Sequence, residues 1–185
     1  MLRELARNPR DIGAVCSSSP ALANEMARAI HPSLLKSGCL IELGAGTGPV
    51  TEALLRRGIS RDKLIIVEKS EALAQCLKER FNGATVLCCG AEEISSKIKL
   101  SSPVAAIVSS LPFRSLPADV SAAIMSEVGR ILAPGGLFVQ FTYALLGEMP
   151  FITADFRKLR SRFILRNVPP AKVEVFRRRK TSVGV

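Results

Sequence analysis

The stretch Ile41-Glu42-Leu43-Gly44-Ala45-Gly46-Thr47-Gly48 decides the fold, together with a short apolar run that ends at Glu68. A buried strand, a tight glycine turn, a helix start and an acid at the end of the next strand are typical of an α/β sheet that holds a nucleoside cofactor. Gly44, Gly46 and Gly48 let the backbone approach a ligand more closely than a Cβ atom would allow. The carboxylate of Glu68 is expected at the C-terminal end of the neighbouring strand, where it can accept hydrogen bonds from both hydroxyls of a ribose.

The spacing of the glycines distinguishes two kinds of nucleoside cofactor. A dinucleotide-binding turn follows Gly-x-Gly-x-x-Gly, with a pyrophosphate at the helix N-terminus. Here the third glycine comes one residue early, at Gly48, and Pro49 stands in the usual place. The run Glu-x-Gly-x-Gly-x-Gly resembles motif I of the class I S-adenosylmethionine-dependent methyltransferases, whose cofactor carries a sulfonium and an amino-acid tail. Glu42 favours a nearby cation and suits that cofactor better than a pyrophosphate. A glycine turn without a ligand is the structural alternative, and the flanking acids argue against it.

Length and composition are those of one α/β domain. The 185 residues are enough for one substantial core and too few for two ordinary domains. Apolar residues reach 48%, but no window approaches the length needed to span a bilayer, and we expect no signal sequence. The five cysteines form no Cys-x-x-Cys pair, so we expect reduced thiols and no metal site.

The positive charge is concentrated near the C-terminus. The net charge is +10, and ten Lys or Arg residues against two acids from Phe151 onward account for eight of these charges. Such a segment favours an anionic partner, either nucleic acid or the inner leaflet of a membrane, and charge alone does not choose between them. Residues 1–18 form a basic, amphipathic segment that either lies on a membrane surface or packs on the domain as a short helix.

Beyond the glycine turn, short apolar runs alternate with helical patterns. We predict strands at 39–43, 64–67, 85–88, 104–108 and 137–142, and helices at 20–30, 50–57, 71–81, 91–98 and 120–131. After Phe151 we expect a basic helix and an antiparallel pair of strands at 163–166 and 173–176. The prediction is a single domain over 19–185: a Rossmann-like, mostly parallel seven-stranded sheet with helices on both faces and an antiparallel last strand.

A second informative segment, Ser109-Ser110-Leu111-Pro112-Phe113, follows the apolar strand predicted at 104–108. In class I methyltransferases this segment faces the transferred methyl group, and amine methylases often carry (Asn/Asp/Ser)-x-Pro-(aromatic) there. A proline fixes the backbone so that carbonyls and a serine hydroxyl can orient the N–H groups of an amine. The aromatic ring can hold a cationic product by a cation–π contact. An ordinary proline turn is the structural alternative, and the position of the segment favours a methyl-transfer loop.

From about Ala6 to Arg178, the chain resembles the bacterial phospholipid N-methyltransferases that act on phosphatidylethanolamine. The resemblance rests on these segments: Ile12-Gly13-Ala14-Val15, Ser18-Ser19-Pro20-Ala21-Leu22-Ala23, the glycine turn with Glu68, Ser110-Leu111-Pro112-Phe113 with Leu116-Pro117, Gln140-Phe141-Thr142-Tyr143, and Asn167-Val168-Pro169-Pro170-Ala171 with Val173. The glycine motif is common to the superfamily. The serine-proline leader, the leucine-proline loop and the Asn-x-Pro-Pro-Ala ending are more specific together.

The resemblance implies roles for individual residues. S-adenosylmethionine, with S-adenosylhomocysteine as the product, would be bound by Glu42, Gly44, Gly46, Gly48, Glu68, Lys69, Ala91, Glu92 and Ser109. The catalytic positions would be Ser109, Ser110 and Pro112 in the methyl-transfer loop and Tyr143 in the headgroup pocket. The family methylates the ethanolamine nitrogen in successive rounds to phosphatidylcholine. No general base is evident, so we expect catalysis by positioning and desolvation, with water taking the proton.

The resemblance also implies an oligomeric state and a cellular location. The sequence departs from the family's pattern at one position. We expect a monomer in the cytoplasm, peripherally bound to phospholipids on the inner face of the membrane. The family has Gly-Asp-Ala after the third strand, with the aspartate near the adenine amino group, whereas this chain has Cys89-Gly90-Ala91. Glu92 or Glu93 is the alternative for that contact.

Two other functions remain open. An rRNA adenine N6-dimethylase has a similar glycine turn and a related loop, and the basic C-terminal segment would suit RNA. Those enzymes favour an asparagine and a stacking tyrosine in the loop, where this chain has Ser110 and Phe113, so nucleic acid is the less favoured partner. A non-catalytic membrane-binding scaffold is the other alternative, and the intact glycine motif argues against it.

Overall fold

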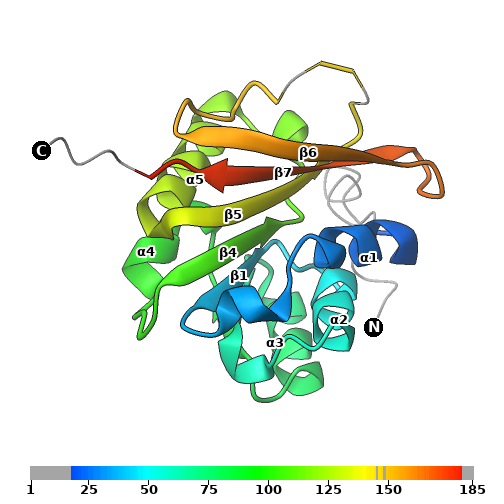
Figure 1. The fold of residues 1–185 in the computed structure, drawn as a ribbon. Coiled ribbons are helices and arrows are strands. Elements are labelled where there is room, and N and C mark those ends of the chain that lie inside the picture. The colour runs from blue at the N-terminus through cyan, green and yellow to red at the C-terminus, as the bar shows by residue number, and fades with distance from the viewer. Residues whose placement is uncertain (1–17, 145, 148, 181–185) are drawn as a thin grey trace, which may run out of the picture.

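A single mixed sheet forms the centre of the computed structural model, which describes residues 18–144, 146–147 and 149–180. Its seven strands follow the order β3-β2-β1-β4-β5-β7-β6 (Figure 1). The strands are β1 (Cys39–Leu43), β2 (Leu64–Glu68), β3 (Thr85–Cys88), β4 (Val104–Ser109), β5 (Leu132–Thr142), β6 (Phe156–Ile164) and β7 (Ala171–Arg178). The chain builds outward from β1 to β3 and then crosses to β4 to build the other half.

Strands β1 to β5 run parallel, and β7 runs antiparallel to both of its neighbours, β5 and β6. The predicted mostly parallel sheet with an antiparallel last strand is therefore confirmed. The carboxyl ends of β1 to β5 share one side of the sheet, which we call the carboxyl edge. The strand order reverses between β1 and β4, and a parallel sheet opens a crevice at such a point.

Helices cover both faces, as predicted. The helices are α1 (Pro20–Arg28), α2 (Pro49–Arg56), α3 (Glu71–Arg80), α4 (Ile94–Lys97) and α5 (Ala118–Ile131), with 3-10 turns η2 (Pro32–Leu35), η3 (Arg61–Lys63), η4 (Ala91–Glu93) and η5 (Phe113–Ser115). α1, α2 and α3 pack in one hydrophobic cluster, and α4 and α5 pack in the other. Neighbouring β1 residues join different clusters, Leu40 the first and Ile41 the second, because side chains alternate across a strand.

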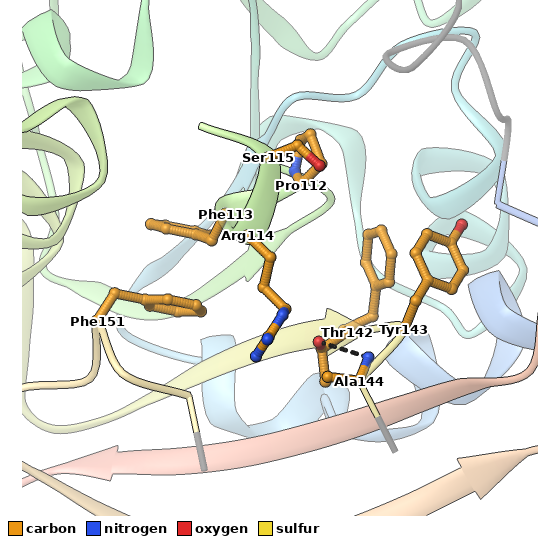
Figure 2. Close-up of a pocket in the computed structure, with 9 residues that line it drawn as sticks. Pro112, Phe113, Arg114, Ser115, Thr142, Tyr143, Ala144 and Phe151 are labelled. Atoms are coloured by element: carbon orange, nitrogen blue, oxygen red, sulfur yellow. Dashed lines mark hydrogen bonds between the residues drawn. The ribbon is translucent and has the colours of Figure 1, made fainter. Parts of the chain in front are cut away.

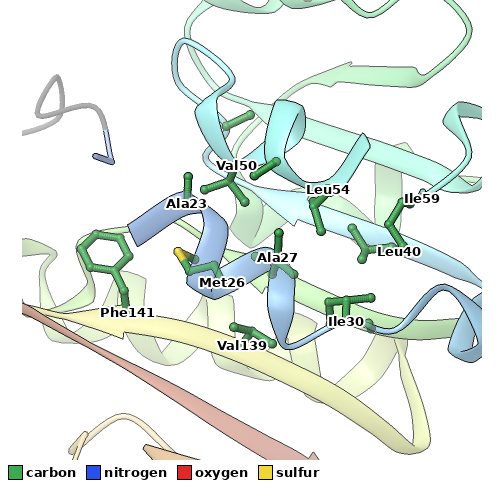
Figure 3. Packing of buried hydrophobic residues seen from close by; sticks show 14 of the residues in the cluster. Ala23, Met26, Ala27, Ile30, Leu40, Val50, Leu54, Ile59, Val139 and Phe141 are labelled. Atoms are coloured by element: carbon green, nitrogen blue, oxygen red, sulfur yellow. The ribbon is translucent and has the colours of Figure 1, made fainter. Parts of the chain in front are cut away.

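Helix α1 is held by its cap and by its apolar face. Ser19 accepts a hydrogen bond at 3.2 Å from the Leu22 N–H, and Pro20 opens the helix. Met26 of α1 and Ile30, two residues after the helix ends, are fully buried in the first cluster. They lie between α2 and β5, so this short helix closes one side of the core (Figure 3).

Four predictions of secondary structure were wrong, one of them the strand at 163–166, of which only residues 163 and 164 lie in a strand. The basic helix expected after Phe151 is absent from the described residues, where 156–164 form β6 and extend the sheet by pairing with β7. The helix predicted at 91–98 is divided into η4 and the single turn α4. The strand predicted at 137–142 begins earlier, at Leu132, because residues 132–136 extend it through an irregular register against β4.

The predicted membrane-surface or packed helix in residues 1–18 lies almost wholly outside the described residues. No helix among the described residues has the length and apolar character to span a bilayer.

Candidate cofactor and acceptor sites

The three glycines of the turn after β1 have positive φ angles and three different surroundings. A Cβ atom on Gly44 would lie 2.5 Å from Leu111 Cδ2, so this glycine lets the loop after β4 approach the turn. A Cβ atom on Gly48 would lie 2.6 Å from Phe81 Cε2, so this glycine lets α2 pack near the end of α3. A Cβ atom on Gly46 would meet nothing within 4 Å, which leaves open space beside the turn.

Glu68 fastens the glycine turn to the end of β2. Its Oε2 accepts the Gly46 N–H at 2.8 Å, and its Oε1 accepts the Ser70 N–H at 2.9 Å. Each carboxylate oxygen can accept a further hydrogen bond, so the predicted contact with ribose hydroxyls is compatible with these bonds. The side chain therefore supports the turn and has capacity left for a ligand.

Glu42 is a fully buried carboxyl group beneath the turn. Thr51 Oγ1 donates to its Oε2 at 2.6 Å, and its Oε1 has no hydrogen-bond partner among the described residues. Burial, with a smaller contribution from Glu68, raises the pKa of Glu42 to about 7. A cation bound nearby would offset the cost of ionising this group. An acid in this position therefore suits a cofactor with a sulfonium and an ammonium group.

A cavity of about 470 Å³ opens where the strand order reverses. Eight of the predicted site residues line it: Gly44, Gly46, Glu68, Lys69, Ala91, Glu92, Ser110 and Pro112. The predicted residues Glu42, Gly48 and Ser109 are not among those that line it. These three support the wall from behind, since Glu42 and Ser109 are fully buried and Gly48 packs against α3.

The sequence interpretation missed the apolar part of this wall. It comprises Leu73, Leu111, Leu116, Val120 and Ile124. Val120 and Ile124 lie in the helix predicted at 120–131, for which we predicted no site residues. The fold brings the first turns of α5 to the carboxyl edge, so these residues also face the cavity. An apolar wall beside polar strand ends suits the adenine and ribose of a nucleoside.

Glu92 occupies the space that a side chain at position 90 would need, where the resemblance implies an aspartate. A Cβ atom on Gly90 would lie 2.4 Å from Glu92 Oε1, so the missing side chain at Gly90 leaves room for the Glu92 carboxylate. Glu92 lines the cavity, whereas Glu93 does not. Lys69 Nζ lies 3.4 Å from Glu92 Oε1, which connects the segments after β2 and β3. Of the two acids considered for the adenine contact, the geometry favours Glu92.

The loop after β4 is fastened to both neighbouring strands. The Ser110 N–H donates to the carbonyl of Leu43 at 2.9 Å, and Gln140 Nε2 donates to the carbonyl of Leu111 at 2.9 Å. The Leu111 N–H donates to Ser109 Oγ at 3.3 Å. Ser110 is among the residues that line the cavity, and its hydroxyl oxygen is buried without a hydrogen-bond partner among the described residues. A loop that is fixed in this way beside a cavity can orient a ligand.

A second cavity of about 350 Å³ lies next to the first, and Pro112 lines both. Phe113 stacks on Phe151 with ring centroids 4.2 Å apart, and Phe141 meets Tyr143 edge to face at 5.2 Å. Arg114 points between these two aromatic pairs (Figure 2). The predicted headgroup residue Tyr143 therefore lines the second cavity and not the first. Sequence reasoning missed Arg114, because nothing in the local pattern indicates where its side chain points.

The chain matches known proteins in sequence over most of its length. Residues 40–136 match a protein family described as a methyltransferase domain. An ornithine lipid N-methyltransferase from Singulisphaera acidiphila is 31% identical over 170 residues, which cover 86% of this chain and 85% of that protein.

Solved structures share the fold. TrmN from Thermus thermophilus matches with a TM-score of 0.69 at 17% identity, over 94% of this chain and 53% of TrmN. A 1,6-didemethyltoxoflavin N1-methyltransferase from Burkholderia thailandensis, with bound S-adenosylhomocysteine, matches with a TM-score of 0.68 at 15% identity, over 97% of this chain and 86% of that one. The unpaired Glu42 and Ser110 oxygens and the open space at Gly46 fit a cofactor of the kind whose product, S-adenosylhomocysteine, the Burkholderia enzyme binds. The chain belongs to the class I S-adenosylmethionine-dependent methyltransferases.

Proposed function

We propose that this enzyme methylates the amine nitrogen of a membrane-lipid headgroup, with phosphatidylethanolamine as the first candidate substrate. The observation that carries the proposal is the shared wall at Pro112, which separates a cofactor-sized cavity from an aromatic one. An amine in the aromatic cavity would reach the methyl-transfer loop from the side opposite the cofactor. The relative that acts on ornithine lipid supports a lipid amine as the acceptor.

The chemistry requires an in-line approach and a place for positive charge. The amine lone pair would form the new N–C bond while the S–C bond of S-adenosylmethionine broke, with its electron pair left on sulfur. The nitrogen carries the positive charge and releases its proton to water before the next round. Ser110 and the backbone carbonyls of its loop would orient the amine. The rings of Phe113, Phe141 and Tyr143 would stabilise the ammonium by cation–π contacts.

Arg114 indicates that the acceptor also carries an anion. Its guanidinium makes no ion pair or hydrogen bond within the described part of the chain, and the side chain lines the aromatic cavity. A guanidinium binds a phosphate or a carboxylate by paired, charge-assisted hydrogen bonds. Phosphatidylethanolamine carries a phosphodiester near its amine. Ornithine lipid, the second candidate and the substrate in the relative's name, offers a carboxylate.

The test uses the purified full chain with methyl-labelled S-adenosylmethionine. Vesicles containing phosphatidylethanolamine, vesicles containing ornithine lipid, and ribosomal subunits are offered separately. Label in either lipid supports lipid N-methylation and identifies the headgroup. Label in RNA alone would overturn the proposal, and label in none of the three would favour the non-catalytic scaffold.

A variant pair tests the acceptor cavity. Arg114→Ala should raise the KM for the lipid about tenfold or more and leave S-adenosylhomocysteine affinity unchanged. Arg57→Ala, at an exposed position at the end of α2, is the matched control and should change neither value. Equal KM values for the two variants would contradict the role given to Arg114.

A further inference from the structure

Large apolar side chains gather at the end of the β6–β7 hairpin. Among the described residues, six such side chains are exposed, and three belong to this hairpin end: Phe163 (55%), Leu165 (75%) and Val168 (87%). A fourth, Leu146 (89%), lies in the loop after the aromatic cavity. Scattered exposed apolar residues are ordinary, but a group at one projecting end marks an interaction surface. We call residues 163–170 the hairpin tip.

The register places the hairpin tip beside the acceptor cavity. Thr142, which lines that cavity, is opposite Lys172 of β7, and Lys172 is opposite Phe163 of β6. The residues after Ile164 therefore continue past the carboxyl edge, and the hairpin extends beyond the ends of β4 and β5 (Figure 1). Lys172 Nζ also donates to the carbonyl of Gly147 at 3.1 Å, which joins the loop containing Leu146 to the hairpin.

Hydrogen bonds of a buried side chain fix the conformation of the hairpin tip. Asn167 is 3% exposed, and its Oδ1 accepts the Ser19 N–H at 3.3 Å. Its Nδ2 donates to the carbonyl of Pro169 at 2.6 Å. These bonds fasten the tip to the start of α1, while Leu165 and Val168 on either side of Asn167 stay exposed. The fold therefore holds apolar side chains in water at a defined position.

Strand β6 and the hairpin tip carry exposed positive charge. The exposed basic residues of β6 and the tip are Arg157, Lys158, Arg160, Arg162 and Arg166. The one acid in β6, the tip and β7 is Glu174, which is fully buried between Lys158 and Lys172. Basic residues alone would be explained as protection of an edge strand against pairing with other chains. That explanation leaves Leu165 and Val168 unexplained.

We infer that the hairpin tip inserts into the surface of an anionic bilayer, with Leu165 and Val168 in the headgroup–acyl boundary and the β6 arginines against lipid phosphates. Apolar side chains backed by Lys and Arg are the pattern of an interfacial membrane contact. An RNA surface would use the arginines and offer nothing to Leu165 and Val168. The inference rests on the proposed function, because this docking would place the acceptor cavity beside the headgroups.

A pair of single tryptophan substitutions tests the insertion directly. The chain contains no tryptophan, so Val168→Trp provides a single indole reporter at the tip. Leu100→Trp is the matched control, because Leu100 is 39% exposed just before β4, at the opposite edge of the sheet. With phosphatidylglycerol-containing vesicles, the emission of Trp at position 168 should shift to the blue and be quenched by brominated lipid. The emission of Trp at position 100 should not change.

A second pair measures the contribution to binding. Leu165→Ser with Arg166→Ser should weaken co-sedimentation with the same vesicles about tenfold. Lys99→Ser with Leu100→Ser removes one cation and one exposed leucine at the opposite edge, and it should bind as the unchanged chain does. Equal binding by both variants would overturn the inference, as would a response of Trp at position 168 to RNA but not to vesicles.

The failure of this inference can be distinguished from the failure of the proposed function. If labelled methyl groups enter vesicle lipid while the emission of Trp at position 168 is unchanged, the docking surface is wrong and the activity stands. If the Trp inserts and no lipid is labelled, the membrane contact stands and the lipid substrate is wrong. Methylation of a detergent-dispersed lipid should be equal in the Leu165→Ser, Arg166→Ser variant and the unchanged chain.

Discussion

At the scale of single residues, neighbouring glycines of one turn serve different purposes. Gly46 has φ +57° and open space where a Cβ atom would lie, whereas Gly48 has φ +87° and Phe81 at 2.6 Å from that position. We expect Gly48→Ala to lower the free energy of unfolding by about 2–4 kcal/mol, through backbone strain and overpacking. Gly46→Ala should cost about 1–2 kcal/mol and weaken S-adenosylhomocysteine binding about tenfold or more. Urea denaturation measures the unfolding free energy, and titration calorimetry measures the affinity for S-adenosylhomocysteine. Equal losses of stability in the two variants would contradict the different roles given to the two glycines.

Glu42 should make stability depend on pH. Its pKa rises from 4.5 to about 7 on folding, so the folded state binds a proton more tightly than the unfolded state. The free energy of unfolding should therefore fall as the pH rises through this window and level off above it. The full loss is roughly 3 kcal/mol. Glu42→Gln keeps the Thr51 partner and removes the titration, so its profile should be flatter. Urea denaturation of cofactor-free protein across this window checks the difference, and parallel profiles would refute it.

At the scale of elements, a buried ionic group joins β6 to β7. Glu174 Oε1 lies 3.2 Å from Lys172 Nζ and 3.3 Å from Lys158 Nζ, and accepts the Ser161 hydroxyl at 2.9 Å. Lys172 has a side chain only 6% exposed, so Glu174→Ala would leave a buried cation without its carboxylate. We expect a loss of about 3–5 kcal/mol in unfolding free energy.

Lys158→Ala is the matched variant for this ionic group. The Lys158 side chain is 36% exposed, so solvent screens its charge and its removal should cost less than about 1 kcal/mol. Chemical denaturation of both variants compares the two positions. Similar losses would mean that burial does not govern the strength of these contacts.

The same element shows why the sequence pattern does not predict a strand at 156–164. The segment carries four cations and no acid, and only Phe156 and Ile164 at its ends are buried. A basic segment without a clear apolar period has no strong local preference. The antiparallel pairing with β7 supplies the backbone hydrogen bonds that favour a strand, and these partners lie beyond the segment, from Ile164 with Ala171 to Phe156 with Arg178.

At the scale of the whole molecule, the charge of +10 should govern association with anionic surfaces. Raising the salt concentration shortens the screening length from about 10 Å at 0.1 M to about 3 Å at 1 M. Vesicle binding should therefore weaken as salt rises, and a fraction should persist because insertion of apolar side chains does not depend on screening. Co-sedimentation across a salt series measures both parts. Binding that is independent of salt would contradict a role for the basic residues.

The sequence by itself determined the features that depend on near neighbours. The glycine turn, the acids Glu42 and Glu68, and the alternation of apolar strands with helices follow from backbone freedom and from periods of burial within a few residues. Those local patterns were sufficient for the parallel strands, for the kind of cofactor and for eight of the residues that line the larger cavity.

Only the tertiary structure decided the features that need distant segments to meet. Arg114 enters an aromatic cavity because the chain after β5 returns beside η5. Glu92 reaches the cavity of about 470 Å³ because Gly90 leaves space for it. The hairpin tip becomes a surface because Asn167 is fastened to α1, far away along the chain. In each case a side chain gains its role from contacts whose geometry depends on the packing of the whole domain.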